Sequence, residues 1–359
     1  MTEALGGERV LVVEPSPGLL RRAARAGFLA WPLADTGDAA ALRAAVAGAV
    51  REHGIAHVLN LAGVRAAGAV FAGAEDAGVA AHAAHTVEAL TDRGALRVLL
   101  GRHPRLRVRA RRVWGADGVQ EAVGGFGGQA VVVRSALAGG RRRAVLLRGE
   151  REVRRWRLGQ AGSGEREPFV VEEYLPGPQY AVETLSVDGM HQVLGIIALD
   201  TTGPPRFVTT THLYPAPLAG RDEATVRSAV CAVLDLAGVE NGAVRTTVVH
   251  SPGGTPRVLA SRQGLDRADH AARLVRLAVG ADLEEAALRA LRGEVPAPVP
   301  AGRSAAVGVL CGADGVRCGA DGGRCGHAPV AVVGAGPSQV LGLLAAARAR
   351  LAGVGRGVT

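Results

Sequence analysis

The sequence predicts a protein of the α/β and α+β classes that begins with a small parallel α/β domain. Residues 9–13 are a short, β-branched run that ends in a turn rich in proline and glycine, which is typical of a buried parallel strand. Apolar residues at helical spacing predict helices over 18–27 and 38–53, and a second short strand is expected at 58–61. Strands that alternate with helices favour a parallel sheet. The turn after the first strand lacks the G-x-G-x-x-G pattern, so no nicotinamide site is predicted.

The composition is that of a folded protein with more than one domain. The chain has 359 residues, enough for two or three domains. Hydrophobic residues make up 48 % and aromatic residues 3 %, so valine, leucine and alanine must build the core. No apolar run approaches the roughly 20 residues that cross a bilayer, and no signal peptide is visible. We therefore expect a cytoplasmic protein without a membrane partner.

The formal net charge is +9, and the sequence contains arginine but no lysine. A basic chain is compatible with nucleic-acid binding, but the aromatic residues that stack on bases are nearly absent. The favoured explanation of the positive charge is therefore a coding bias toward alanine, glycine and arginine. Nucleic acid is disfavoured as a partner. Residues 105–111 alternate between arginine and apolar residues, which predicts a strand with one arginine face. A solvated face is favoured there over a groove that tracks phosphates.

A strand, a short connector and a second strand are predicted in the middle of the chain. Apolar residues from Phe169 lead into Glu172 and Glu173, a Pro-Gly-Pro turn occupies 176–178, and a second strand begins at Tyr180. The connector exposes backbone groups that can read the edge of a flat ring. This stretch resembles the adenine-binding hinge of the ATP-grasp superfamily, in particular its carboxylate–amine and amino-acid ligases.

A second segment carries the same resemblance. It runs from Thr201 through a Gly-Pro-Pro turn to Leu218, and it contains His212. The resemblance implies an ATP-grasp fold with ATP as cofactor. It implies a Rossmann-like domain over 1–85, an ATP-grasp domain of two subdomains clasping a nucleotide cleft over 86–294, and a small C-terminal lobe over 295–359.

The resemblance also assigns residues to the nucleotide. It implies that Glu172 and Glu173 lie at the adenine edge and that Leu175 offers backbone contacts. Gln179 stands where the family usually has a carboxylate for the ribose hydroxyls, and Glu183 faces the nucleotide pocket in the family. The alternative for Glu172 and Glu173 is a solvated strand end.

Arginines replace the phosphate-binding lysines of the family. Arg93 and Arg134 stand at those two positions, and the loop after Arg134 contains Gly139 and Gly140 followed by three arginines. Arginine keeps the charge of lysine but is larger and planar. The alternative is a surface hairpin with a basic tip. The resemblance also places His212 near phosphate or substrate. The alternative is that His212 is a structural histidine.

The magnesium ligands of the family are missing. Where the family carries two glutamates and an asparagine, this chain has Thr247, Ala260 and Arg262, and no acidic residue lies between Arg245 and Leu265. A like charge at about 4 Å costs on the order of 4 kcal/mol per unit of metal charge at an effective dielectric of about 20. Magnesium is therefore doubtful, and no metal site is predicted. The alternative is that Arg262 itself supplies positive charge to a phosphate.

The sequence also predicts the elements around these positions. Asp222 is expected to cap a helix that Gly238 ends, and Thr91 or Asp92 to cap an earlier helix. In the tail, Cys311, Cys318 and Cys325 belong to a seven-residue duplication. A duplicated surface loop is favoured there over a zinc site, because no C-x₂-C pair exists.

Two functions remain open at this level. The first is an ATP-dependent carboxylate–amine ligase that forms an amide through an acyl phosphate, with an impaired phosphate site. The second is a non-catalytic relative that binds a nucleotide, a metabolite or a partner protein. The partners would be small carboxylates and amines in the first case, and a homodimer is compatible with both.

Overall fold

The N-terminal part of the molecule is a parallel α/β layer. The computed structural model describes residues 7–79, 82–136, 144–159, 167–203, 207–264, 270–295, 302–308 and 330–354. Strand β1 lies between two parallel neighbours, in the order β2-β1-β3. The elements are β1 (Arg9–Val13), α1 (Pro17–Arg25), β2 (Leu29–Leu33), α2 (Ala39–His53), β3 (His57–Asn60) and α3 (Val64–Asp76). The predicted parallel layer is confirmed, while β2 and α3 were not predicted.

A four-stranded antiparallel sheet follows, in the order β4-β7-β5-β6. Its core is formed mainly by valine and phenylalanine side chains from these strands and from α6 and α7. Between residues 84 and 173 the chain forms α4 (Ala84–Thr91), α5 (Arg93–Gly101), β4 (Ala110–Trp114), α6 (Gly115–Gly124), β5 (Val131–Ser135), β6 (Val145–Leu147), α7 (Glu150–Leu158) and β7 (Pro168–Glu173).

The strand expected over 105–111 is wrong for most of its length. The backbone N–H groups of Leu106 and Arg107 both donate to the carbonyl of His103, so this segment turns after α5. Strand β4 begins only at Ala110. The alternation of arginine and apolar residues therefore reflects a turn and an irregular lead-in, where Leu106 and Val108 are buried.

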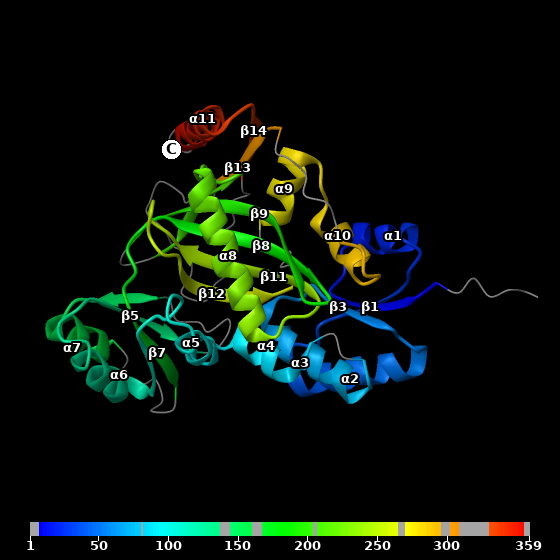
Figure 1. The fold of residues 1–359 in the computed structure, drawn as a ribbon, viewed down its shortest axis with the longest axis horizontal. Helices are drawn as coiled ribbons and strands as arrows, with labels where there is room; N and C mark the ends of the chain where they lie inside the picture. Colours follow the sequence, from blue (N-terminus) through cyan, green and yellow to red (C-terminus); the bar gives the residue numbers. More distant parts are fainter. Residues whose placement is uncertain are drawn as a thin grey trace, which may run out of the picture.

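The largest sheet has seven strands in the order β12-β11-β8-β9-β10-β13-β14, all antiparallel to their neighbours. Its elements are β8 (Gln179–Val187), β9 (Met190–Thr201), β10 (Thr209–Tyr214), α8 (Gly220–Ala237), β11 (Gly242–Val249), β12 (Arg257–Gln263), α9 (Ala271–Val279), α10 (Leu283–Ala290), β13 (Ser304–Gly308), β14 (Val330–Gly334) and α11 (Pro337–Val354). Figure 1 shows α8 lying across one face of this sheet.

The two faces of the sheet belong to different cores. Val182, Val244 and Val258 point toward α8 and α5 and share one cluster with them. Leu185 and Ile197 share another cluster with α1, α9, α10 and β1. The N-terminal layer therefore packs on the same side of the sheet as α9 and α10.

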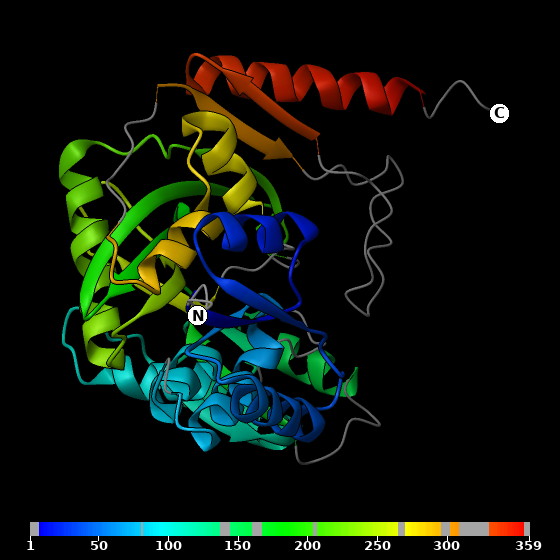
Figure 2. The same cartoon turned by 90° about the vertical axis from the view of Figure 1, so that its right-hand side faces the viewer.

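The C-terminal strands extend this same sheet. Strand β13 pairs with β10, and β14 pairs with β13, so the part expected as a separate lobe is hydrogen-bonded to the sheet of the preceding part. Figure 2 shows β14 and α11 at the end of the molecule opposite to α2 and α3. The domain limits 1–85, 86–294 and 295–359 stay a prediction.

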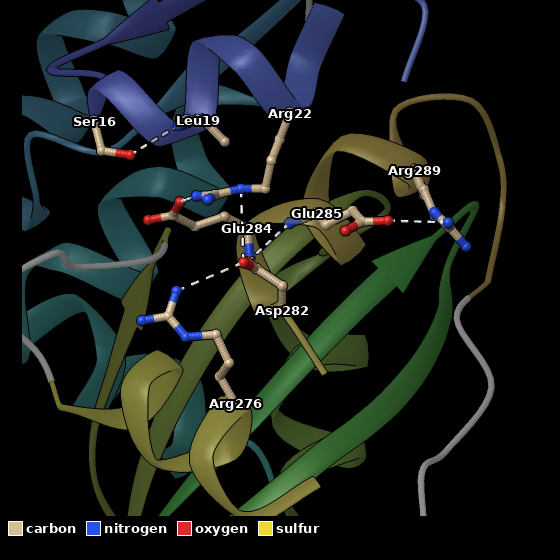
Figure 3. Close-up of polar contacts among 8 residues, drawn as sticks. All are labelled: Ser16, Leu19, Arg22, Arg276, Asp282, Glu284, Glu285 and Arg289. Atoms are coloured by element: carbon tan, nitrogen blue, oxygen red, sulfur yellow. Dashed lines mark hydrogen bonds and ion pairs between the residues drawn. The ribbon is translucent and has the colours of Figure 1, made fainter. Parts of the chain in front are cut away.

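Ion pairs connect the N-terminal layer to α10. Arg22 of α1 pairs with Glu284, and its Nε lies 3.6 Å from Asp282 Oδ2. Asp282 also caps α10, because its Oδ1 accepts hydrogen bonds from the backbone N–H groups of Glu284 and Glu285. Figure 3 shows these side chains converging between the two helices, with Arg276 joining from α9. This contact fixes the N-terminal layer beside the sheet.

Two of the three predicted helix ends are confirmed. Asp92 caps α5 through the backbone N–H of Ala95, and Gly238 ends α8 in the left-handed conformation. The expected cap at Asp222 is wrong, since α8 begins at Gly220. Asp222 Oδ1 instead accepts the backbone N–H of Gly253 at 3.0 Å and lies 2.9 Å from His250 Nε2. Asp222 therefore ties the turn between β11 and β12 to α8.

Candidate nucleotide site

A buried carboxylate surrounded by arginines lies between the four-stranded and the seven-stranded sheets. Glu172 of β7 is 2 % exposed, and Arg97 of α5 donates from Nε to its Oε2 at 2.8 Å. Arg134 of β5 approaches the other oxygen, with Nε 2.9 Å from Oε1. Burial acts to raise the pKa of Glu172, but Arg97, Arg134 and Arg93 together hold that pKa below its ordinary value. Glu172 therefore organises positive charge and stays ionised.

Arg93 lies beside the same cluster at the start of α5. Burial lowers its pKa to about 10, and the nearby positive charges of Arg134, Arg97 and Arg262 add to this effect, against the attraction of Glu172. The backbone N–H of Arg93 donates to the carbonyl of Ala136, next to the end of β5. The structure thus brings together Arg93 and Arg134, the two predicted phosphate-binding residues.

A second charged row crosses the large sheet. Glu183 on β8, Arg245 on β11 and Arg262 on β12 lie opposite one another in register, so their side chains share one face. Arg245 NH1 lies 3.2 Å from Glu183 Oε1, and both side chains are buried. Burial raises the pKa of Glu183, and Arg245 and Arg262 oppose that rise.

His212 lies on the same side of the sheet. On β10 it pairs with Leu199, whose side chain belongs to the core shared with α9 and α10. Its ring meets that of His270 edge to face, with centroids 5.3 Å apart. Burial lowers the pKa of His212 to about 3, helped by Arg245, His270 and Arg262, so the imidazole is neutral. Its Nδ1 is buried without a hydrogen-bond partner among the residues that the structure describes.

The hinge residues lie where β7 passes into β8. Glu173 faces away from Glu172, because its Oε1 accepts the backbone N–H of Arg109 at 3.0 Å and pairs with Arg257 at 2.5 Å. The connector that contains Leu175 joins the two sheets, and Gln179 begins β8 opposite Val249. The roles of Glu172, Glu173, Leu175, Gln179 and Glu183 toward adenine, ribose and phosphate stay predictions.

The residues at the expected metal positions come together in space. Thr247 and Ala260 lie directly opposite each other on β11 and β12, and Arg262 lies two residues further along. One hydroxyl, one methyl and one guanidinium do not fit Mg²⁺, which takes carboxylate and carbonyl oxygens. Over the described part of the chain, no group of three or more histidine, cysteine or acidic side chains is arranged to hold a metal.

Three members of the charged clusters were not predicted from the sequence: Arg97, Arg245 and His270. Arg97 follows Arg93 by four residues on a helix, and Arg245 precedes Thr247 by two residues on a strand. These spacings place each on the same face as its predicted neighbour, so the period of each element was a usable signal. For His270, no comparable pattern exists.

A serine–histidine–aspartate row lies elsewhere on the large sheet. Ser186 Oγ is 2.7 Å from His191 Nδ1, and His191 Nε2 is 3.2 Å from Asp235 Oδ1. The order of groups is that of a hydrolase triad. Ser186 is completely buried, however, and a nucleophile has to reach its substrate. This row is therefore a structural link between β8, β9 and α8.

Some predicted features fall on residues outside the described part. These are the glycines and arginines of the loop 137–143 and the duplicated cysteine segment 311–327. Within the described residues, no helix combines the length and the apolar character needed to cross a bilayer.

Solved structures with a similar fold exist, although comparisons of the sequence find no match. No family profile and no curated protein matches the sequence. Among solved structures, L-amino acid ligase from Bacillus licheniformis superposes with a TM-score of 0.71 at 16 % identity, over 85 % of this chain and 80 % of that chain. The ADP complex of N5-carboxyaminoimidazole ribonucleotide synthetase gives 0.69 at 12 % identity, over 85 % and 82 %.

A third solved structure with a similar fold was determined with nucleotides and bicarbonate bound. The biotin carboxylase domain of Hydrogenobacter thermophilus 2-oxoglutarate carboxylase, solved with MgADP, ADP and bicarbonate, gives a TM-score of 0.67 at 13 % identity, over 84 % of this chain and 74 % of that chain. At these identities the likeness concerns the fold. The N-terminal parallel layer, the two antiparallel sheets and these structural neighbours together show that the chain has the ATP-grasp fold.

Proposed function

We propose that this protein binds ATP or a closely related nucleotide and does not catalyse magnesium-dependent ligation. The observation that carries the proposal is the set of side chains on the β11–β12 hairpin, where Thr247 faces Ala260 and Arg262 faces Arg245. In the family these positions supply carboxylate and amide oxygens to two metal ions. Those ions bridge and neutralise the phosphates during transfer, so a site without their ligands lacks the main source of catalysis.

Electrostatics oppose a metal at this hairpin. A guanidinium at about 4 Å from a divalent cation costs on the order of 8 kcal/mol at an effective dielectric of about 20. Arg245 and Arg262 both occupy this face, and Glu183 is already paired with Arg245. The same charges favour an anion. In this proposal the protein therefore binds an anion at this face but no metal ion.

The second candidate is an ATP-dependent carboxylate–amine ligase, which would join a small carboxylate to a small amine through an acyl phosphate. One observation favours it: Arg93 and Arg134 still converge on the predicted phosphate region around Glu172. In this case the arginines would replace both the lysines and the metals of the family. Release of ADP or phosphate in the presence of carboxylate and amine substrates distinguishes the two candidates.

The proposal is tested by the melting temperature of the purified protein with ATP, in EDTA and in Mg²⁺. A ligand that binds the folded state at a hundredfold excess over its Kd stabilises by about 2.7 kcal/mol. We expect a rise with ATP in EDTA and no release of ADP with a mixture of amino acids. A rise that requires Mg²⁺, or turnover in the presence of amino acids, would contradict the loss of the metal site. If the melting temperature rises in neither buffer, the proposed binding of ATP is wrong.

A further inference from the structure

The turn between β11 and β12 holds both ends of the connector between β7 and β8, which consists of residues 174–178. At one end of the connector, the carbonyl of Pro178 accepts the backbone N–H of His250, the residue that follows β11, at 3.1 Å. At the other end, Glu173 Oε1 accepts a hydrogen bond of 2.5 Å from Nη2 of Arg257, the first residue of β12. The two sides of the turn therefore support the two ends of the connector.

The middle of the connector lies directly against the same turn. Gly177 has a φ of 137°, and a Cβ atom at this position would lie 3.0 Å from Ser251 Oγ and 3.0 Å from a methyl carbon of Val249. Contacts this short leave no room for a side chain, so glycine lets the two backbones approach each other. The position of the connector is therefore set by the turn along most of its length.

Helix α8 fixes the turn in its place through Asp222. Its Oδ1 accepts the backbone N–H of Gly253 at 3.0 Å and lies 2.9 Å from His250 Nε2. The hydrogen bonds from Gly253 and His250 hold the pKa of Asp222 below its ordinary value. An ionised carboxylate only accepts hydrogen bonds, so the proton of the second bond belongs to His250. The imidazole of His250 is 1 % exposed, which leaves it little freedom to move.

The connector offers backbone donors to a ligand. Among the residues that the structure describes, the backbone N–H groups of Leu175 and Gly177 donate to no hydrogen bond. A fixed N–H beside a fixed C=O fits adenine, whose amino group donates next to a ring nitrogen that accepts. Guanine carries an acceptor in place of that amino group. Peptide groups discriminate between the two bases only while they are held in position.

We propose that Asp222 and Arg257 are positioning residues that give the nucleotide site its preference for adenine over guanine. They act through the turn, which holds the connector in the conformation that meets the base, and neither side chain has to touch the nucleotide. Asp222 holds the turn to α8, and Arg257 holds it to the end of β7. This inference rests on the proposed nucleotide binding, because the nucleotide supplies the base.

The experiment measures Kd for ATP and GTP by calorimetry in EDTA. We expect the unmodified protein to prefer ATP, and Asp222→Ala to weaken ATP about tenfold while GTP changes little. Asp222→Asn should keep most of the preference, because an amide oxygen still accepts both hydrogen bonds. The matched control is Glu223→Ala, which removes the same charge from the next residue of α8, where Glu223 pairs with Arg227. Its preference should be that of the unmodified protein.

Hydrogen exchange tests the positioning without any ligand. The backbone N–H groups of residues 174–178 should exchange faster in Asp222→Ala than in Glu223→Ala, because the turn no longer holds the connector. Exchange at the same rate in both variants overturns the inference. Circular dichroism confirms that each variant is folded.

The outcomes separate this inference from the proposed function. Equal changes of Kd for ATP and GTP in Asp222→Ala, or no preference for ATP in the unmodified protein, overturn the inference and leave nucleotide binding intact. Binding of neither nucleotide to the unmodified protein overturns the proposed function and the inference with it. If Asp222→Ala does not fold, Arg257→Met decides, since it breaks the contact at the other end of the connector. A loss confined to ATP then supports the inference, and any other result overturns it.

Discussion

Arg97 Nε donates a hydrogen bond to Glu172 Oε2 at 2.8 Å, and this buried contact joins helix α5 to strand β7. The same guanidinium donates to the carbonyls of Val258 and Leu259, so one side chain connects α5 to both sheets. Removing one partner of a buried ion pair is expensive, because the other charge remains in the interior.

We predict that Arg97→Leu lowers the free energy of unfolding by about 3 kcal/mol. The control is Arg112→Leu, which breaks a 3.3 Å pair with Asp92 that involves a more exposed arginine and should cost under about 1 kcal/mol. Denaturation in guanidinium chloride measures both. Equal losses for the two variants would show that Glu172 does not depend on Arg97.

The contact between α1 and α10 should contribute to stability in the same way. Arg22→Ala removes the partner of Glu284 and Asp282, whose side chains are mostly buried, and we expect a loss of about 2 kcal/mol. Arg289→Ala breaks an exposed pair within α10 and should cost less than about 0.5 kcal/mol (Figure 3). Thermal unfolding of both variants checks the order. A larger effect at Arg289 would contradict it.

Two buried histidines predict a loss of stability in acid. Burial lowers the pKa of His82 to about 4, and burial together with nearby positive charges lowers that of His212 to about 3, from an ordinary value of 6.5. Below pH 6.5 the unfolded chain therefore binds protons that the folded protein does not. The free energy of unfolding should fall by about 1.4 kcal/mol per pH unit for each histidine as the pH drops toward 4.

Urea denaturation between about pH 7 and about pH 5 measures this slope. His212→Gln should reduce the slope, while His85→Gln, at an exposed position, should leave it unchanged. A slope that is the same in all three proteins would exclude His212 as its source.

Restoring the oxygen ligands should restore metal dependence. In the variant Thr247→Glu, Ala260→Glu and Arg262→Asn, the new side chains lie on facing strands, so we expect Mg²⁺ to increase the stabilisation by ATP. The matched control is the variant Thr247→Gln, Ala260→Gln and Arg262→Asn. Melting temperatures with ATP in EDTA and in Mg²⁺ compare the two. Mg²⁺ dependence in the control as well would show that the carboxylates are not the cause.

Much of the fold was predictable because the strands of this chain are strongly patterned. The β-branched run of β1, the Pro-Gly-Pro connector between β7 and β8, and the hairpin of β11 and β12 all lie where expected. Strand β2 was not predicted, since it contains Pro32, which weakens a strand pattern. The run 105–111 has the alternating pattern of a strand because Leu106 and Val108 are buried in a turn and in the irregular segment that follows it.

The candidate site was less predictable, because its partners come from distant parts of the chain. Arg134 and Glu172 meet across neighbouring strands β5 and β7, and Arg97 reaches them from α5. Sequence spacing within one element indicates which residues share a face, as for Thr247 and Arg245. It does not indicate which element packs against that face, so the pairing of Arg97 with Glu172 required the structure.

The alternation along β11, together with the register shift that skips Leu259 on β12, places the apolar core residues of this hairpin and the expected metal positions on opposite faces. Val244, Val248 and Val258 face the core under α8, while Thr247, Ala260 and Arg262 face the opposite side and are only half-buried. A lineage can therefore exchange metal ligands for arginines at this hairpin with little risk to folding, and the same positions are where a designer could install new chemistry.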